Sequence, residues 1–161
     1  MSVNPLRRHF TLAIAIGYGW LAALRSTSST AANELTVGKL DALSQRAVSI
    51  TTGASIRNGR ITIHTPRLAD NGHSVPIAVR VDCAMTAQEF VRRIVLISER
   101  NPRPIIATFH LNAKSGRAEI ATRIRLNKTQ RVMALAELSD GSFWADCAEV
   151  IVTESACLDA E

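Results

Sequence analysis

Aromatic residues are scarce in this sequence: two tryptophans, one tyrosine and four phenylalanines among 161 residues. The chain carries 19 Lys and Arg against 14 Asp and Glu, a surplus that alone would suit binding to nucleic acid. Three of the basic residues, Arg7, Arg8 and Arg25, lie in the first 32 residues, which leaves 16 basic against 14 acidic residues in the remainder. Because that remainder is nearly neutral and poor in aromatics, we do not expect a nucleic-acid-binding protein.

The residue patterns of the common enzyme classes are also missing. The sequence has no Gly-rich phosphate-binding loop. Ser115 and Ser142 fall in predicted turns without a His and Asp to activate them. His64 and His110 lie in strand patterns and His73 in a turn, without the close spacing of a metal site. We therefore predict no free-standing enzyme, no metal site and no cofactor.

No apolar run is long enough to span a membrane. The longest, Leu12 to Leu24, has thirteen residues, and at about 1.5 Å per residue it covers about 20 Å of a roughly 30 Å hydrocarbon core. The pair Arg7 and Arg8 precedes it in LRRHFTLA, as in a twin-arginine signal. We predict that residues 1–32 are a cleaved signal peptide, exporting the protein to the periplasm with no stable membrane anchor; an uncleaved anchor is the alternative.

Hydrophobic residues alternate with polar ones through most of the remaining chain, which is typical of half-buried strands. The clearest run extends from Ala118 to Leu126, with arginines and a glutamate on its other face. Asp140 and Gly141 predict a hairpin turn before a last strand that opens at Phe143. The other expected strands begin at Ile61 and lie at 75–81, 90–98, 105–111 and 132–138. About seven short antiparallel strands predict an all-β, immunoglobulin-like β-sandwich; a seven-stranded barrel is the alternative.

A short helix is predicted ahead of the strands. From Glu34 to Ile50 the apolar residues follow helical spacing. The helix would either cover the sheet or help to dock a partner. The chain is thus divided into a signal peptide at 1–32, a helix and linker at 33–57, a sandwich at 58–152 and a C-terminal tail at 153–161.

The three cysteines are an odd number for an exported protein, so at least one thiol is free or intermolecular. Cys83 follows a strand that ends at Val81, and Cys147 lies within the last strand. These two are either free thiols or a disulfide across the sandwich. Cys157 differs, because it follows the expected end of the last strand, Val152, by five residues. An extended tail of that length spans at most about 17 Å.

Several phrases of the sequence resemble the SoxY family of the periplasmic thiosulfate-oxidising Sox system. They are NGHSVPIAV, CAMTAQEFVRRI, NPRP, ATFH, SGRAEIATRIRL and SDGSFW, within residues 58 to 152. The resemblance implies an immunoglobulin-like fold, a SoxZ-like partner subunit, and Sox enzymes of the SoxXA, SoxB and SoxCD types as further partners. It also implies that a C-terminal cysteine, here Cys157, carries sulfur covalently.

The tail departs from the family pattern. In SoxY the carrier cysteine is flanked by glycines as GGCGG, whereas this chain ends TESACLDAE. Side chains in place of glycines widen and stiffen the tail, and nearby carboxylates disfavour the thiolate. The sequence therefore predicts a periplasmic sulfur carrier, with a divergent paralogue that acts as a binding or assembly subunit as the alternative.

Overall fold

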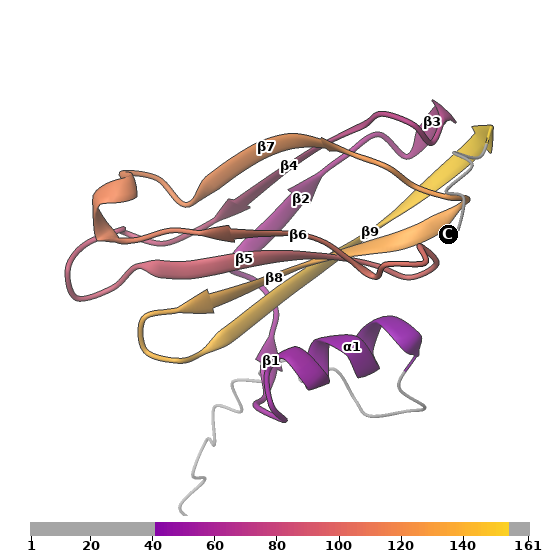
Figure 1. Cartoon of the computed structure of the whole chain (residues 1–161). Coiled ribbons are helices and arrows are strands. Elements are labelled where there is room, and N and C mark those ends of the chain that lie inside the picture. The colour runs from indigo at the N-terminus through magenta and orange to yellow at the C-terminus, as the bar shows by residue number, and fades with distance from the viewer. Residues whose placement is uncertain (1–40, 155–161) are drawn as a thin grey trace, which may run out of the picture. The chain divides into compact units, whose positions relative to one another are not determined.

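Residues 41–154 are the part of the chain that the computed structural model describes, and they form two β-sheets and one α-helix (Figure 1). The elements are α1 (Ala42–Ile50), β1 (Ile56–Arg57), β2 (Ile61–His64), β3 (Leu68–Asn71), β4 (Val75–Val81), β5 (Val91–Ser98), β6 (Ile105–His110), the 3-10 helix η1 (Ala113–Ser115), β7 (Glu119–Ile124), β8 (Gln130–Leu138) and β9 (Phe143–Glu154). The predicted signal peptide lies outside the described residues. No helix in this part is long and apolar enough to cross a membrane.

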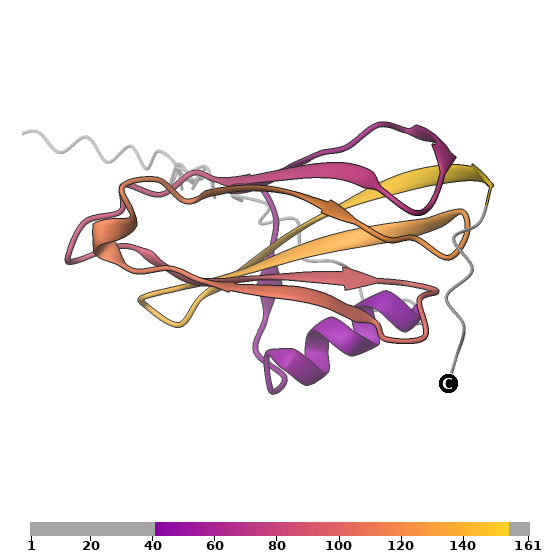
Figure 2. The same cartoon turned by 45° about the horizontal axis from the view of Figure 1, so that its top comes forward.

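The predicted sandwich is confirmed. One sheet has the order β1-β9-β8-β5-β6, with β3 also paired to β9, and the other has the order β2-β4-β7. In Figures 1 and 2 these sheets lie as two layers, with α1 against the outer side of the larger one. The strands do not close into a barrel. Seven of the strands, β2 and β4 to β9, correspond to those predicted.

Two short strands were missed, and both run parallel to β9. β1 pairs with its beginning, whereas β3 pairs with its end. The residues Asp70, Asn71 and Gly72 favour a turn over a strand in this segment. Pairing with β9 overrides that local preference, so two short parallel pairs are added to the antiparallel strands that the sequence predicted.

The main core lies between the two sheets. β4 shows the predicted alternation, with Val75, Ile77, Val79 and Val81 buried and the residues between them more exposed. The predicted inward face of β7 and its flanks also packs here, through Ala118, Ile124 and Leu126.

A second core lies between the larger sheet and α1. Leu43 and Ala47, one helical turn apart, pack against a set of sheet residues. That set is Val95, Ile97, Met133, Leu135 and Ala145. Strands β5 and β8 are therefore buried on both faces. Of the two roles considered for the helix, covering the sheet is the one observed.

Polar contacts fix α1 in place. Asp41 caps the helix, since its Oδ1 accepts hydrogen bonds from the amides of Leu43 at 3.1 Å and Ser44 at 3.0 Å. The helix therefore begins at Ala42; residues 34–40, the first part of the predicted helical stretch, lie outside the described residues. Arg131 of β8 contacts Asp41 Oδ2 at 2.8 Å and Glu99 Oε1 at 3.0 Å. This network ties the start of the helix to the sheet.

Candidate functional site

The predicted carrier residue, Cys157, lies outside the described residues, so the site is built from the strand that leads to it. β9 continues to Glu154, two residues past the predicted end at Val152. β3 holds this last part: the amide of Ile151 donates to the carbonyl of Arg67 at 2.7 Å, and the amide of Gly72 donates to the carbonyl of Glu154 at 2.8 Å. The base of the tail is therefore part of the sheet.

Side chains reinforce the same segment. The hydroxyl of Thr153 donates to the carbonyl of Asp70 at 2.6 Å. On the other edge of β9, the amide of Val152 donates to Thr129 Oγ1 at 3.0 Å, and that hydroxyl donates to the carbonyl of Val152 at 3.3 Å. These bonds secure the strand from both sides as far as Glu154.

A buried polar pair supports the loop that carries Thr129. Asn101 Oδ1 accepts from Gln130 Nε2 at 2.8 Å and from the amide of Asn127 at 3.1 Å, while its Nδ2 donates to the carbonyl of Arg125 at 2.8 Å. Every buried polar side-chain atom between residues 41 and 154 has a partner. This satisfied network holds the β7–β8 connection beside the end of β9.

The longer strand shortens the free tail. Cys157 is the third residue after Glu154, so their Cα atoms lie at most about 11 Å apart in a fully extended chain. The sequence had suggested about 17 Å, counted from Val152. The end of β9 therefore limits how far the thiol can lie from the fold.

Cys147 lies on the face of β9 that is turned toward α1, and it pairs in register with Met133 of the second core. It retains solvent access, but surrounding protein atoms raise the pKa of its thiol to about 11, and the charge of Asp146 adds to the rise. At neutral pH this group is a thiol, which is a poor nucleophile.

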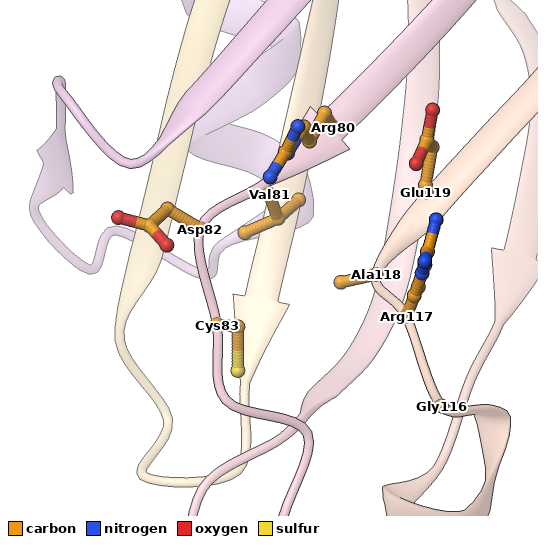
Figure 3. A pocket seen from close by; sticks show the side chains of 8 residues that line it. All are labelled: Arg80, Val81, Asp82, Cys83, Gly116, Arg117, Ala118 and Glu119. Atoms are coloured by element: carbon orange, nitrogen blue, oxygen red, sulfur yellow. The ribbon is translucent and has the colours of Figure 1, made fainter.

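Cys83 lies on the inner side, in the loop after β4, where it packs against the core between the sheets. It borders a hollow of about 320 Å³ whose rim carries Arg80 and Glu119 together with Arg117 (Figure 3). In Figure 3 the side chain of Asp82 points away from Arg117, which lies in the segment before β7. The hollow thus presents charges of both signs beside a half-buried thiol.

Of the two possibilities for Cys83 and Cys147, the disulfide is not formed, and both residues are free thiols. The two side chains belong to opposite faces of the larger sheet, because Cys147 faces the α1 side and Cys83 packs on the inter-sheet side. A disulfide between them would have to pass through the sheet. It would also require the two Cα atoms to lie within about 7 Å of each other.

Neither thiol is within reach of Cys157 in the same chain. Cys147 lies seven positions before Glu154 in β9, or about 23 Å, against a tail of about 11 Å. Cys83 is farther still, since it follows Asp82, whose amide donates to Arg60. Arg60 stacks on Trp144, near the beginning of β9. Both described thiols thus lie well away from the end of β9.

Trp144 is half-buried and lies far from the tail. Its ring contacts Arg57 at 5.8 Å and Arg60 at 5.5 Å from the ring centre, and its Nε1 donates to Ser142 Oγ at 3.1 Å. These contacts fasten the segment before β2 to the β8–β9 hairpin.

The histidines and serines that the sequence singled out lie among the described residues and form no catalytic group there. His64, His73 and His110 are all exposed, on separate elements. Ser142 bonds to Asp140 and Trp144, and Ser115 caps η1 with Asn112. Across residues 41–154, no three His, Cys, Asp or Glu side chains gather where a metal ion could be held.

The residues that secure the tail base were not singled out from the sequence. Leu68, Asp70 and Thr129 act through a parallel strand pairing and a loop contact. Parallel partners far apart in sequence leave no local signal, so only the turn at Gly72 was visible.

Comparisons with known proteins agree with this architecture. The family described as "Sulfur oxidation protein SoxY" matches residues 47–157. The sulfur carrier protein SoxY from Chlorobium limicola f thiosulfatophilum has a similar structure, with a TM-score of 0.56 and 24% identity, covering 68% of this chain and 94% of that one. None of the curated proteins matches significantly.

Superoxide reductases share the fold at lower identity. A putative superoxide reductase from Thermotoga maritima has a TM-score of 0.55 and 17% identity, covering 62% of this chain and 95% of that one. A superoxide reductase (neelaredoxin) from Ignicoccus hospitalis has a TM-score of 0.53 and 16% identity, covering 58% and 80%. Identities this low show a common fold alone. The family match spans more than half of the sequence and ends at Cys157 itself, and the chain belongs to the SoxY family of sulfur oxidation proteins.

Proposed function

We propose that the protein is a periplasmic sulfur carrier that holds sulfur intermediates covalently on Cys157 and presents them to Sox enzymes. One observation carries the proposal: of the three thiols, only Cys157 follows the secured end of the fold, and neither Cys83 nor Cys147 is within its reach. A thiol kept from intrachain pairing is available for a bond to an incoming sulfur compound.

The proposed reaction joins the thiol to thiosulfate. The Cys157 thiolate and the outer sulfur of thiosulfate form an S–S bond, giving Cys–S–S–SO₃⁻, and the thiol loses its proton to solvent. Two electrons leave in this step, so an electron-accepting Sox enzyme, of the SoxXA type, must take them. SoxB-type and SoxCD-type enzymes would act on the bound sulfur later, with a SoxZ-like subunit holding the domain.

The tail itself is expected to slow this reaction. Ser155, Ala156, Leu158 and Asp159 carry side chains at positions where the family pattern has glycine. They widen the segment that enters the enzyme, and the carboxylate of Asp159 disfavours both the thiolate and an anionic substrate. Solvent and salt screen the charge.

The glycine-free tail also favours a second candidate. A SoxY-family subunit that binds partners without carrying sulfur would have no need for a slim tail. In that case the sandwich and its docking surfaces serve assembly, and Cys157 has no adduct.

Mass spectrometry separates the two candidates. The protein is incubated with thiosulfate and the partner enzymes, and a mass increase on Cys157 is expected. Cys157→Ser should abolish the adduct, whereas Cys83→Ser and Cys147→Ser should keep it. Glycine at positions 155, 156, 158 and 159 should speed conjugation. An unmodified Cys157 under these conditions, with the glycine variant no better, supports the assembly subunit.

A further inference from the structure

Two exposed apolar side chains lie beside the base of the tail. Leu68 of β3 is 57% exposed and Ile151 of β9 is 37% exposed, and the two are partners in the β3–β9 register. Within residues 41–154, the one other exposed large hydrophobic residue is Ile105. Single exposed apolar residues are ordinary, but two of three are adjacent and lie three residues from the end of β9.

This position matters because the tail is short. Glu154 is held by Gly72, and Thr153 by Asp70, so the strand cannot peel away without losing those bonds. The remaining three residues allow Cys157 to project by at most about 11 Å. An enzyme that shields the reacting sulfur from water must bring its active-site mouth to the end of β9, and so onto Leu68 and Ile151.

We propose that Leu68 and Ile151 form a docking surface for the Sox enzyme that conjugates sulfur to Cys157, and that this enzyme bears an apolar patch at the mouth of its active site. This inference rests on the proposed function. We call the pair the tail-base surface.

The size of the tail-base surface fits a transient contact. Stable complexes bury about 800 Å² per partner, far more than two partly exposed side chains offer. A carrier that passes among several enzymes needs contacts that release quickly. Removing the two side chains should therefore weaken binding measurably, by about tenfold, rather than abolish it.

The test measures binding separately from chemistry. The chain is coexpressed with its SoxZ-like subunit in a Cys157→Ser background, so that no covalent capture contributes. The dissociation constant for the SoxXA-type enzyme is then determined for this parent and for Leu68→Thr with Ile151→Thr, since threonine keeps strand preference while shortening the apolar side chain. Thermal melting confirms that each variant is folded.

Ile105→Thr is the matched control. Ile105 is likewise an exposed isoleucine in a strand, 51% exposed, but β6 lies at the far edge of the larger sheet from β9. The double variant should bind about tenfold more weakly and the control as tightly as the parent. An unchanged double variant, an equal loss in the control, or no measurable binding by the parent would each overturn the tail-base surface.

Failure of the proposed function has a different signature. If the unsubstituted chain binds through Leu68 and Ile151 yet gains no adduct on Cys157, the docking surface stands and the carrier chemistry falls. If the adduct forms while the double variant binds normally, the carrier chemistry stands and the docking surface falls.

Discussion

At the scale of single residues, the surroundings of each thiol determine its reactivity. The pKa of Cys147 is raised to about 11, first because surrounding protein atoms desolvate the thiolate and then because of the charge of Asp146. At pH 8 a much smaller fraction of it is therefore thiolate than of an ordinary cysteine with a pKa near 8.5. The greater nucleophilicity of a more basic thiolate offsets part of this difference.

We therefore predict that iodoacetamide at pH 8 labels Cys157 at least tenfold faster than Cys147, as measured by mass spectrometry of digested protein. Labelling of Cys147 should rise steeply between pH 9 and 11, because the thiolate fraction grows as the pH approaches the raised pKa. Urea-unfolded protein is the control, since there the two rates should converge. Equal rates in the folded state would contradict the assigned environment of Cys147.

The position of Trp144 in its strand follows from the sequence, but its contacts do not. Its place at the opening of the last strand was predicted and is observed. Its half-burial and its contacts with Arg57 and Arg60 were not predicted. Those contacts depend on β1, a strand of two residues whose pairing is set by β9 and not by its own sequence.

At the scale of elements, α1 depends on charged groups for its attachment. Backbone bonding to Ser44 and then contact with Arg131 lower the pKa of Asp41, and the Arg131 hydrogen bond is the main cause that lowers the pKa of Glu99. A carboxyl with a lowered folded pKa binds fewer protons than it does in the unfolded chain. Its contribution is present above its ordinary pKa near 4 and is lost as pH falls below it.

Arg131→Met should therefore reduce the free energy of unfolding at pH 7 by about 1 kcal/mol, since the ion pairs are partly exposed. The difference from the parent should shrink between pH 5 and 3 as Asp41 and Glu99 take up protons. Urea denaturation at several pH values measures both effects. Arg80→Met, at an exposed position of β4, is the control and should show no such pH dependence; a constant deficit for Arg131→Met would contradict the network.

Alternation of apolar and polar residues predicts the buried face of some strands better than that of others. Period-2 alternation located β4 and β7 because one face of each is covered and the other is solvated. The same alternation underestimated the burial of β8, because α1 covers the face that bears Met133 and Leu135. In β6 an irregularity in the pairing with β5 leaves Ile105 exposed while Ile106 packs against the core. Phe109 and Leu111 pack there as alternation predicts, so the pattern fails only at the beginning of the strand.

At the scale of the whole molecule, the family was visible in the sequence but the geometry of its site was not. The phrases that resemble SoxY lie within the matched residues. The attachment of β3 to β9, which sets the reach of Cys157, required long-range pairing that no local pattern encodes. The spacing of Cys83 and Cys147 likewise left their pairing open, and opposite sheet faces decide it.

Export is a property of the whole chain that the signal prediction makes testable. Replacing Arg7 and Arg8 by Lys should leave the precursor in the cytoplasm, because the twin-arginine pair is read by a receptor and is not merely a positive charge. Cell fractionation with immunoblotting measures the distribution. A variant with Lys at both positions keeps the charge unchanged, so normal export of it would rule out the twin-arginine route.

Assembly with a second subunit is the last prediction. The sequence suggested that the helical stripe from Leu35 to Ile50 offers apolar surface to a partner, but Leu43 and Ala47 are already buried against the sheet of their own chain. We expect a stable one-to-one complex with a SoxZ-like subunit that uses other surfaces of the sandwich. Loosening α1 with Arg131→Met should then leave this complex intact.

Sedimentation velocity of the coexpressed subunits tests this expectation, with the chain alone as the reference. A single heterodimer boundary for both the parent and Arg131→Met supports docking away from α1. Dissociation only in Arg131→Met would mean that the position of the helix shapes the interface. The substitution mainly removes the ion pairs of the Arg131 side chain with Asp41 and Glu99. Monomers alone in the parent sample would contradict heteromeric assembly and leave the tail without the fixed base that a carrier needs.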